Sequence, residues 1–539
     1  MGIPSYFSYI IKNHANIIKR RNNVPRVFTS LYMDCNSIIY DSLRQIPDSN
    51  PDGIEMRIVD AVIAKIREYI SVICPTNVLY IAFDGVAPLA KMEQQRIRRY
   101  KTGYLASIDF WGTGQVKSEG WSTSAITPGT AFMDLLSAQV RRAFGDSSVT
   151  GTKTVIVSGS DEPGEGEHKM FQYMRDHALQ TETIAVYGLD SDLIMLSLFH
   201  CFACQNIYIF REAPAFGKAV EGRFDANELI YLDHRSLSNA ILREQGITTT
   251  SGNEARSRIY DYIFTCFLLG NDFLPHFPSL NIRTHGNTTI LDTYKRVIGN
   301  RADRRFIGLE SGNIQWRWVK LFLKELANEE PRSILEEYES RHKMEKRFYP
   351  TTKKEEREVA FDNIPVIYRA EEHYINPKER GWESRYYDVA FHNEGEEGFI
   401  ESVCNNYLEG LEWVFRYYTE GCPHWRWKYR FHYPPLFADL VKYVPEFETT
   451  FIDGSKGINR AFHPYTQLCY VIPKWNQEKV LPKKALQIAR KHSTKYVDME
   501  KLEFQWMFCR YFWESHALLP EMSCEFLEQI DEQCLLINT

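Results

Sequence analysis

The stretch NVLYIAFDGVAPLAKMEQQRIRRYKTGY (77–104) joins a β-branched and aromatic run to an acidic residue, Asp84, and then to a helical pattern. Three other runs also end at an acidic residue: RVFTSLYMD (26–34), TKTVIVSGSD (152–161) and TIAVYGLD (183–190). Helical patterns such as residues 53–73 lie between them. Strands that alternate with helices predict βαβ units, and therefore an α/β fold with a largely parallel sheet flanked by helices.

Acidic side chains gather where these predicted strands end. Parallel sheets bind their ligands at the carboxyl ends of the strands, so we expect the acids to meet at one edge. Two more segments add to them: the flexible, acidic VSGSDEPGEGEHKM (157–170), and FLLGNDFLPH (267–276), in which Gly270 predicts the end of an apolar helix. The candidate carboxylates are Asp34, Asp84, Glu165, Glu167, Asp190, Asp192 and Asp272.

So many negative charges at one edge require cations. Carboxylate oxygens are hard ligands that suit Mg²⁺ or Mn²⁺ better than zinc, so we predict a site for two such ions held by these acids. Two metals about 3.5–4 Å apart typically serve the hydrolysis of phosphate esters. The alternative for any single acid is a helix cap or a turn, and a D-x-D after a strand also occurs in HAD-type phosphatases. The succession of acids at strand ends favours the metal site, with Asp161 and Glu162 left as loop residues.

A cationic face follows Asp84 on the predicted helix. Lys91, Gln95 and Arg98 recur at helical spacing with Arg99 beside them. A solvated surface stripe is the alternative. The closeness of this face to a predicted metal ligand favours a pocket for a terminal phosphate, which arginine forks and a lysine would bind well. A 5′-phosphate pocket beside a two-metal site would make an exonuclease that degrades a strand from its 5′ end.

The chain changes character after about residue 295. We predict an α/β core over 1–295, a helical, charged connector over 296–365, an aromatic-rich, mostly helical or irregular module over 366–495 packed on the core, and a closing helical segment over 496–539. The charged stretch 329–361 is expected to be an exposed helix and linker.

Composition narrows the class of protein. The 539 residues are 44% hydrophobic and 25% charged, which is typical of a globular enzyme, and the net charge of −6 argues against coating of nucleic acid by bulk charge. The 11 cysteines show no repeated spacing, which indicates a reducing compartment, and we expect the one close pair, Cys201 and Cys204, to be buried free thiols. No apolar run approaches the ~20 residues of a membrane span, and no signal peptide is expected.

Six motifs resemble, in order, the first conserved region of the Xrn family of 5′→3′ exoribonucleases. They are MGIPSYF (1–7), LYMDCNSIIY (31–40), AFDGVAPLAKMEQQRIRRY (82–100), PGEGEHKM (163–170), YGLDSDLIML (187–196) and FLLGNDFLPHFPSL (267–280). WESRYY (382–387), CPHWRWKYRFHYPP (422–435) and QLCYVIP (467–473) resemble its second region. The resemblance spans about residues 1–485.

The resemblance implies a nuclease core like that of PIN and flap nucleases. The seven acids would bind metal, and Lys91, Gln95, Arg98 and Arg99 would form a 5′-phosphate pocket too narrow for a capped or triphosphorylated end. Trp425 or Trp427 would stack on the first bases; without the family, core or interface positions are the alternative for both. Tyr40 stands where the family usually has a histidine that stacks on the terminal base. A tyrosine ring can also stack, so we expect altered stepping of the strand through the site (a changed ratchet) rather than loss of activity.

The sequence therefore predicts a metal-dependent 5′→3′ exoribonuclease that degrades single-stranded RNA with a 5′-monophosphate end to 5′ mononucleotides. We expect a monomeric intracellular protein of the cytoplasm or the nucleus that is not bound to a membrane. The alternatives are a flap-endonuclease-like DNA nuclease, which the aromatic-rich module argues against, and an inactive RNA-binding scaffold, which the complete acidic set argues against.

Overall fold

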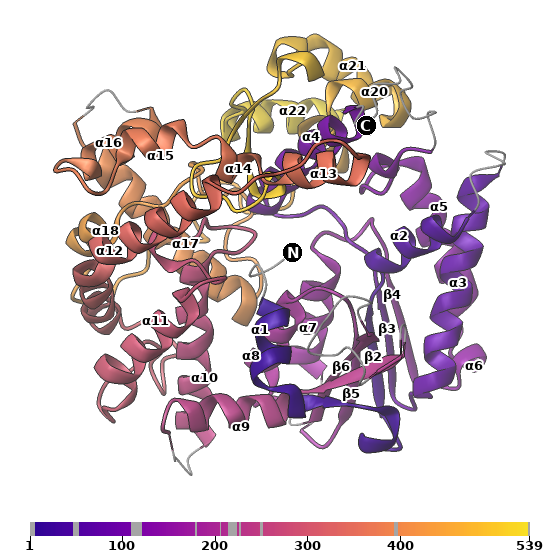
Figure 1. The fold of residues 1–539 in the computed structure, drawn as a ribbon. Coiled ribbons are helices and arrows are strands. Elements are labelled where there is room, and N and C mark those ends of the chain that lie inside the picture. The colour runs from indigo at the N-terminus through magenta and orange to yellow at the C-terminus, as the bar shows by residue number, and fades with distance from the viewer. Residues whose placement is uncertain are drawn as a thin grey trace.

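A seven-stranded mixed sheet forms the core of the computed structural model (Figure 1). The structure describes residues 6–46, 53–108, 121–177, 180–204, 206–213, 224–225, 228–247, 252–392 and 397–536, so the first five residues of MGIPSYF lie outside it. The strands are β1 (Ile18–Lys19), β2 (Ser30–Asp34), β3 (Val78–Ala82), β4 (Thr154–Ser158), β5 (Thr183–Tyr187), β6 (Asn206–Glu212) and β7 (Leu229–Asp233).

The sheet has the strand order β1-β7-β6-β5-β2-β3-β4. Strands β2 to β6 run parallel, and Met33 of β2 lies level with Ile81 of β3 and Tyr187 of β5. This confirms the predicted parallel sheet and the four strands that end in acids. The sequence prediction omitted β1, β6 and β7; β7 pairs antiparallel with β6 and with β1.

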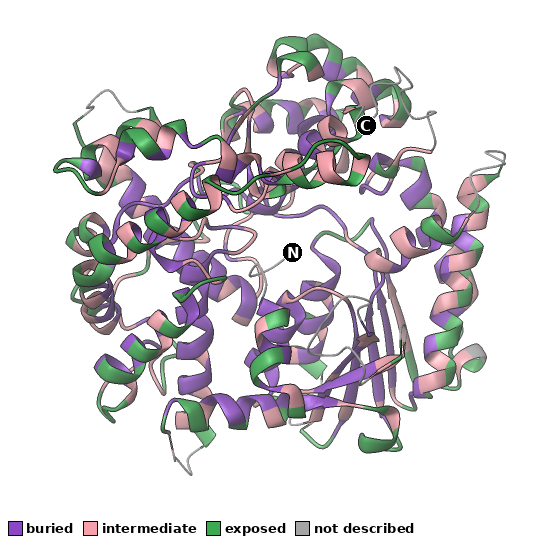
Figure 2. Ribbon diagram, viewed as in Figure 1, coloured by how far each residue is buried: buried purple, intermediate pink, exposed green. Residues whose placement is uncertain are grey.

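Helices cover both faces of the sheet because its side chains alternate between two apolar cores. Leu31 and Met33 pack in the core formed with α2 (Asn36–Gln45), α3 (Ile54–Ile73) and α5 (Ala131–Phe144). Tyr32 faces the opposite core. The helices of that second face are α1 (Tyr6–Asn13), α7 (Gly166–His177), α8 (Asp192–His200), α9 (His234–Glu244) and α10 (Gly252–Cys266). Figure 2 shows the central strands buried between these layers and the outer side of α3 exposed.

The aromatic-rich module shares its core with the sheet. Its central helix α17 (Phe399–Thr419) buries Trp413 and Tyr417 in the same apolar cluster as α7 and α8. Helix α4 (Leu89–Ser107) leaves the sheet and packs Leu89 and Met92 against the C-terminal helices (Figure 1). These helices are α19 (Pro464–Val471), α20 (Lys474–Val480), α21 (Lys483–Lys491) and α22 (Cys524–Leu536). The remaining helices of the core and the module are α6 (Ser147–Thr150), α11 (Gly286–Tyr294), α15 (Ala370–Ile375), α16 (Trp382–Phe391) and α18 (Phe437–Tyr443).

The charged connector is only partly exposed. It forms α12 (Trp316–Glu345), α13 (Lys354–Asp362) and α14 (Ile364–Ile367). The expectation of a solvated helix is wrong for Glu330 and Arg341, which are 2% and 1% exposed. Arg341 pairs with buried Glu372, and Glu330 accepts hydrogen bonds from the first backbone N–H groups of α18. Tertiary partners therefore bury charges that the sequence assigns to solvent.

Two smaller features complete the fold. The closing segment contains α22 and also a two-stranded antiparallel sheet, β8 (Glu503–Gln505) and β9 (His516–Leu518). Cys201 and Cys204 are buried and free, as predicted. No described helix combines the length and apolar character needed to cross a bilayer.

Candidate active site

The predicted acids come from the carboxyl ends of the strands and the loops that follow them. Asp34 is the last residue of β2, and Asp84 follows the end of β3. Glu165 and Glu167 flank Gly166, where α7 begins after the loop from β4. The other three acids follow β5, begin α8 or follow the short helix Phe267–Leu269: Asp190, Asp192 and Asp272.

Three of these acids form the tightest group. Carboxylate oxygens of Asp34, Asp84 and Glu167 all lie within 4.8 Å of one another. The backbone N–H of Gly166 donates to Asp84 Oδ1 at 2.7 Å and so helps to hold this carboxylate in place. A Cβ atom at Gly166 would lie only 2.9 Å from Asp34 Oδ1, so any other residue would push these groups apart. Gly166 thus permits the close approach of these carboxylates.

Burial and mutual repulsion perturb these groups. Burial and the neighbouring Asp84 raise the pKa of Asp34 to about 8, and burial with Asp272 raises that of Asp192 to about 7. Burial and Glu165 also raise the pKa of Glu167 well above its ordinary value. Asp192 Oδ1 is buried and accepts no hydrogen bond from the described residues. These carboxylates are buried oxygen ligands, and one of their oxygens lacks a hydrogen-bond partner. Both features suit the binding of divalent cations.

Lys91 of α4 connects the acids with the cationic face. Its ammonium lies 2.8 Å from Asp272 Oδ2 and also pairs with Glu165. Burial lowers the pKa of Lys91, but Asp272 and Glu165 outweigh it and raise the value well above normal. The same pairing opposes burial and keeps the pKa of Asp272 below its usual range.

The rest of the predicted phosphate pocket lies along α4. Gln95 is buried, and its Oε1 accepts a hydrogen bond from Gln467 Nε2 at 3.2 Å. Arg98 is exposed. Arg99 donates to the Ile126 carbonyl at 3.2 Å, and burial lowers its pKa to about 10.

The predicted base-stacking residues occupy different environments. Trp427 is 9% exposed, lies parallel to Trp413 at 5.2 Å and donates to Glu409, which are features of a core residue. Trp425 is half-buried, and its carbonyl accepts a hydrogen bond from Leu89 at the start of α4. Tyr40, also half-buried, interacts electrostatically with Arg99.

Sequence reasoning missed the residues that hold the acids in place. The Tyr417 hydroxyl of α17 donates to Glu165 Oε1 at 2.8 Å, and its ring stacks on His168 at 3.7 Å. The adjacent Tyr418 interacts with Asp192. Asn36, two residues after Asp34, donates its amide to Asp84. Only the position of Asn36 next to a predicted ligand could have indicated its role.

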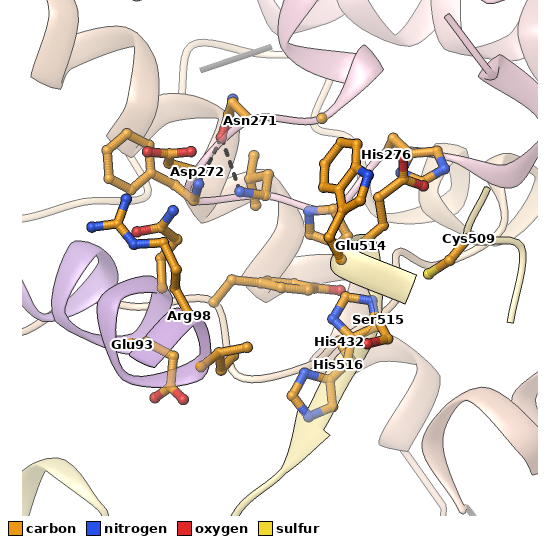
Figure 3. A pocket seen from close by; sticks show the side chains of 18 of the residues that line it. Glu93, Arg98, Asn271, Asp272, His276, His432, Cys509, Glu514, Ser515 and His516 are labelled. Carbon is orange, nitrogen blue, oxygen red and sulfur yellow. Dashed lines mark hydrogen bonds between the residues drawn. The ribbon is translucent and has the colours of Figure 1, made fainter. Parts of the chain in front are cut away.

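A cavity of about 940 Å³ adjoins this site between α4 and the aromatic-rich module. Figure 3 shows Arg98 and Asp272 on one side of it and His432 and His516 on the other. Asp190 also lines it, so the cavity reaches the edge of the sheet that carries the acids.

Fold and site together define an α/β protein with a buried acidic cluster at the carboxyl edge of its sheet, and the oxygen donors of this cluster suit divalent cations. A family model described as the N-terminus of the XRN 5'-3' exonuclease matches residues 1–213, and the model of the Xrn1 helical domain matches residues 254–374 and 368–535. The chain belongs to the XRN 5'-3' exonuclease family, as the motifs predicted.

Curated relatives extend over most of the chain. The 5'-3' exoribonuclease 1 of Schizosaccharomyces pombe is 28% identical over 89% of this chain and 44% of its own length. The 5'-3' exoribonuclease 2 of Gallus gallus is 27% identical over 96% of this chain and 68% of its own length. The chain thus spans less than half of the length of the Schizosaccharomyces pombe relative. The catalytic core of Rad2 in complex with DNA aligns with a TM-score of 0.29 and 15% identity over 55% of this chain and 69% of that one.

Proposed function

We propose that the protein is a 5′→3′ exoribonuclease that hydrolyses single-stranded RNA with a 5′-monophosphate end to 5′ mononucleotides. The observation that supports this best is that Lys91, one residue of the cationic face of α4, contacts Asp272 and Glu165 of the acidic cluster. A phosphate bound on that face would lie next to the groups that bind metal. Family membership supports the same reaction.

The acids supply the chemistry through two divalent cations, Mg²⁺ or Mn²⁺. Asp34, Asp84 and Glu167 form the closest set of ligands, and the other four acids complete the site. Bound ions would supply Lewis-acid catalysis for hydrolysis of the phosphodiester and would neutralise the acids. The raised pKa values of Asp34 and Asp192 fall when cations take the place of protons.

The protein's own residues select and hold the end of the strand. Lys91, Arg98 and Arg99 bind the terminal phosphate, because a monoester carries more charge than the diesters along the strand. Gln95, held by Gln467, supports that pocket from α4. Tyr40 and Trp425 offer half-buried rings for the first bases, and such stacking is indifferent to sequence. We further propose that the protein works as a monomer in RNA degradation, in the cytoplasm or the nucleus.

Digestion of end-labelled substrates tests this function. RNA that carries a 5′-monophosphate, triphosphate or hydroxyl is compared with DNA of the same sequence, with Mg²⁺ and with EDTA. We expect release of mononucleotides from monophosphorylated RNA alone, and none with EDTA. Cleavage of DNA at internal or flap positions would indicate the flap-nuclease alternative, and binding of RNA without cleavage would indicate a scaffold.

A further inference from the structure

Arg211 lies at the point where strand β5 leaves the sheet. The pairing of β5 with β6 ends at Tyr187 and Phe210, one residue before Arg211. On its other side β6 is still held in the sheet, because Arg211 pairs with Ile230 of β7. The chain after β5 continues through a short loop to α8, and this loop carries Asp190. Arg211 thus belongs to a strand that is fixed beside a loop that is not part of the sheet.

The guanidinium of Arg211 is bonded to that loop. Its Nη1 donates to the carbonyl oxygen of Leu189 at 2.7 Å. The carbonyl of Leu189 and the N–H of Asp190 belong to one planar peptide unit, so this hydrogen bond fixes the plane from which Asp190 extends. The loop has little room to adjust, since a Cβ atom at Gly188 would lie 2.1 Å from Leu193 Cδ1. The orientation of Asp190 is therefore set in part by Arg211.

A second contact ties the same guanidinium to helix α1. Cζ of Arg211 lies 4.5 Å from the ring centroid of half-buried Phe7, and a cation at this distance is attracted to the face of an aromatic ring. Burial lowers the pKa of Arg211 against the opposing effects of Tyr187 and two nearby carboxylates, and an arginine remains charged in any case. Through Arg211, the MGIPSYF motif is therefore linked to the acidic edge of the sheet.

We propose that Arg211 is a positioning residue for the metal site, which holds Asp190 in the orientation in which this carboxylate binds a divalent cation. The inference rests on the proposed function, which assigns Asp190 as a metal ligand. Arg211 cannot be a ligand itself, because a guanidinium is cationic and accepts no bond. Since its Nη1 is bonded to Leu189, it acts through the loop and the peptide unit before Asp190.

Binding of Mn²⁺ to the full chain in the absence of RNA, followed by electron paramagnetic resonance, tests this role. Arg211→Met keeps the apolar stem and removes the donor. We expect it to bind Mn²⁺ about 10–100-fold more weakly, the typical cost of losing a group that orients a ligand. Phe7→Leu removes the aromatic face beside Arg211 and should weaken binding about twofold to fivefold, the loss expected for a partly exposed cation–π contact. Because Phe7→Leu keeps an apolar side chain, it should fold even if Arg211→Met does not.

Arg304→Met is the matched control. Arg304 also donates its Nη1 to a backbone carbonyl, that of Val297 at 2.9 Å, and lies over an aromatic ring, that of Trp318 at 5.2 Å. Both arginines are half-buried, and the Nε atom of each has no hydrogen-bond partner among the described residues. Val297 lies in the helical turn Lys295–Gly299, which carries none of the predicted ligands. The two variants should lose similar stability in urea, but only Arg211→Met should lose affinity for Mn²⁺.

Asp190→Ala separates failure of this inference from failure of the ligand assignment. If Asp190→Ala weakens Mn²⁺ binding while Arg211→Met and Phe7→Leu bind as the wild type does, Asp190 is a ligand that Arg211 does not position, and the inference is overturned. Wild-type binding by Asp190→Ala would overturn the assignment of Asp190 and the inference with it.

Two further measurements complete the test. An equal loss of affinity in Arg304→Met would indicate general destabilisation, and a raised KM for RNA in Arg211→Met with unchanged Mn²⁺ affinity would indicate direct contact with RNA; either result overturns the inference. Failure of the proposed function is distinct: the variants would then differ in Mn²⁺ affinity as expected, but the wild type would leave monophosphorylated RNA intact.

Discussion

Lys91 Nζ lies 2.8 Å from Asp272 Oδ2, and this contact joins the face that would bind phosphate to the acids that would bind metal. Lys91 also pairs with Glu165, so a single ammonium partly neutralises two acids from distant segments. Since divalent cations would take over that neutralisation, binding of metal should release Lys91 towards a terminal phosphate. The two parts of the site are therefore expected to work together.

Removal of one acid should abolish activity. Asp192→Ala or Glu167→Ala should lower hydrolysis of monophosphorylated RNA by more than the roughly 10–100-fold that loss of an outer-shell partner costs, because a ligand itself is lost. Initial rates on end-labelled RNA measure this effect. Loss of a buried like charge should leave the melting temperature at or above that of the wild type.

The matched control for this prediction is Asp161→Ala. Asp161 lies on the same loop, but its side chain is 57% exposed and pairs with Arg141 at 2.7 Å. Its variant should hydrolyse RNA at close to the wild-type rate. Equal losses for Asp161→Ala and Glu167→Ala would contradict the assignment of the metal ligands.

Arg99→Ala should reduce the preference for a 5′-monophosphate over a 5′-hydroxyl. The pKa of Arg99, lowered to about 10, leaves the guanidinium charged at pH 7, and a hydrogen bond to a charged group contributes about 1.5–3 kcal/mol. We therefore expect the ratio of kcat/KM for the two ends to fall by about tenfold to a hundredfold. Arg332→Ala, at an exposed position of α12, should keep the ratio; the same ratio in both variants would place the pocket elsewhere.

Tyr417→Phe should weaken metal binding without disrupting the fold. The variant removes the hydroxyl that donates to Glu165 and keeps the ring that stacks on His168. Loss of a group that orients a metal ligand typically costs 10–100-fold in affinity. Titration with Mn²⁺ followed by electron paramagnetic resonance measures the change directly, without reference to activity.

Tyr407→Phe is the matched control for Tyr417→Phe. Tyr407 lies on the same helix and is buried, but its hydroxyl donates to the Pro275 carbonyl at 3.1 Å. Each variant should lose about 1 kcal/mol of stability with its hydrogen bond. Only Tyr417→Phe should lose affinity for Mn²⁺, so similar losses in both would indicate a purely structural role.

The sheet and the position of the acids could be predicted from the sequence, because both depend on local patterns of residues. Each predicted strand is a short apolar run, and its acid follows within a few residues, so topology alone brings the acids to one edge. Strand β6 carries a similar apolar run that ends at Glu212, but this acid is not one of the seven predicted ligands, and the sequence prediction did not include the strand. The contact of Tyr417 with Glu165 spans 252 residues, so only the folded chain reveals it. Likewise, only the packing in the folded chain distinguishes half-buried Trp425 from buried Trp427.

In the charged connector, too, tertiary contacts decide which charged side chains are buried, and the burial of Glu330 should make stability depend on pH. The sequence predicts a solvated helix face at Glu330, but this side chain is buried and accepts hydrogen bonds at 3.1 and 3.3 Å from the backbone N–H groups of Phe437 and Ala438. Burial outweighs these bonds and, with Asp439 and Glu383 nearby, raises its pKa from 4.5 to about 8. The folded state therefore binds this proton more tightly than the unfolded state between these two values.

A carboxyl whose pKa is raised on folding lowers stability as pH increases, because the unfolded state ionises first. Glu330 should thus contribute a loss of stability as the pH rises from about 4.5 to about 8. Glu330→Gln should make this decline shallower by a few kcal/mol, since one pKa unit corresponds to about 1.4 kcal/mol. Urea unfolding at pH 5, 6.5 and 8 measures it, with exposed Glu336→Gln as the control. Asp34 and Asp192 titrate equally in all three proteins, so parallel profiles for wild type and Glu330→Gln would show that Glu330 is already ionised at pH 5.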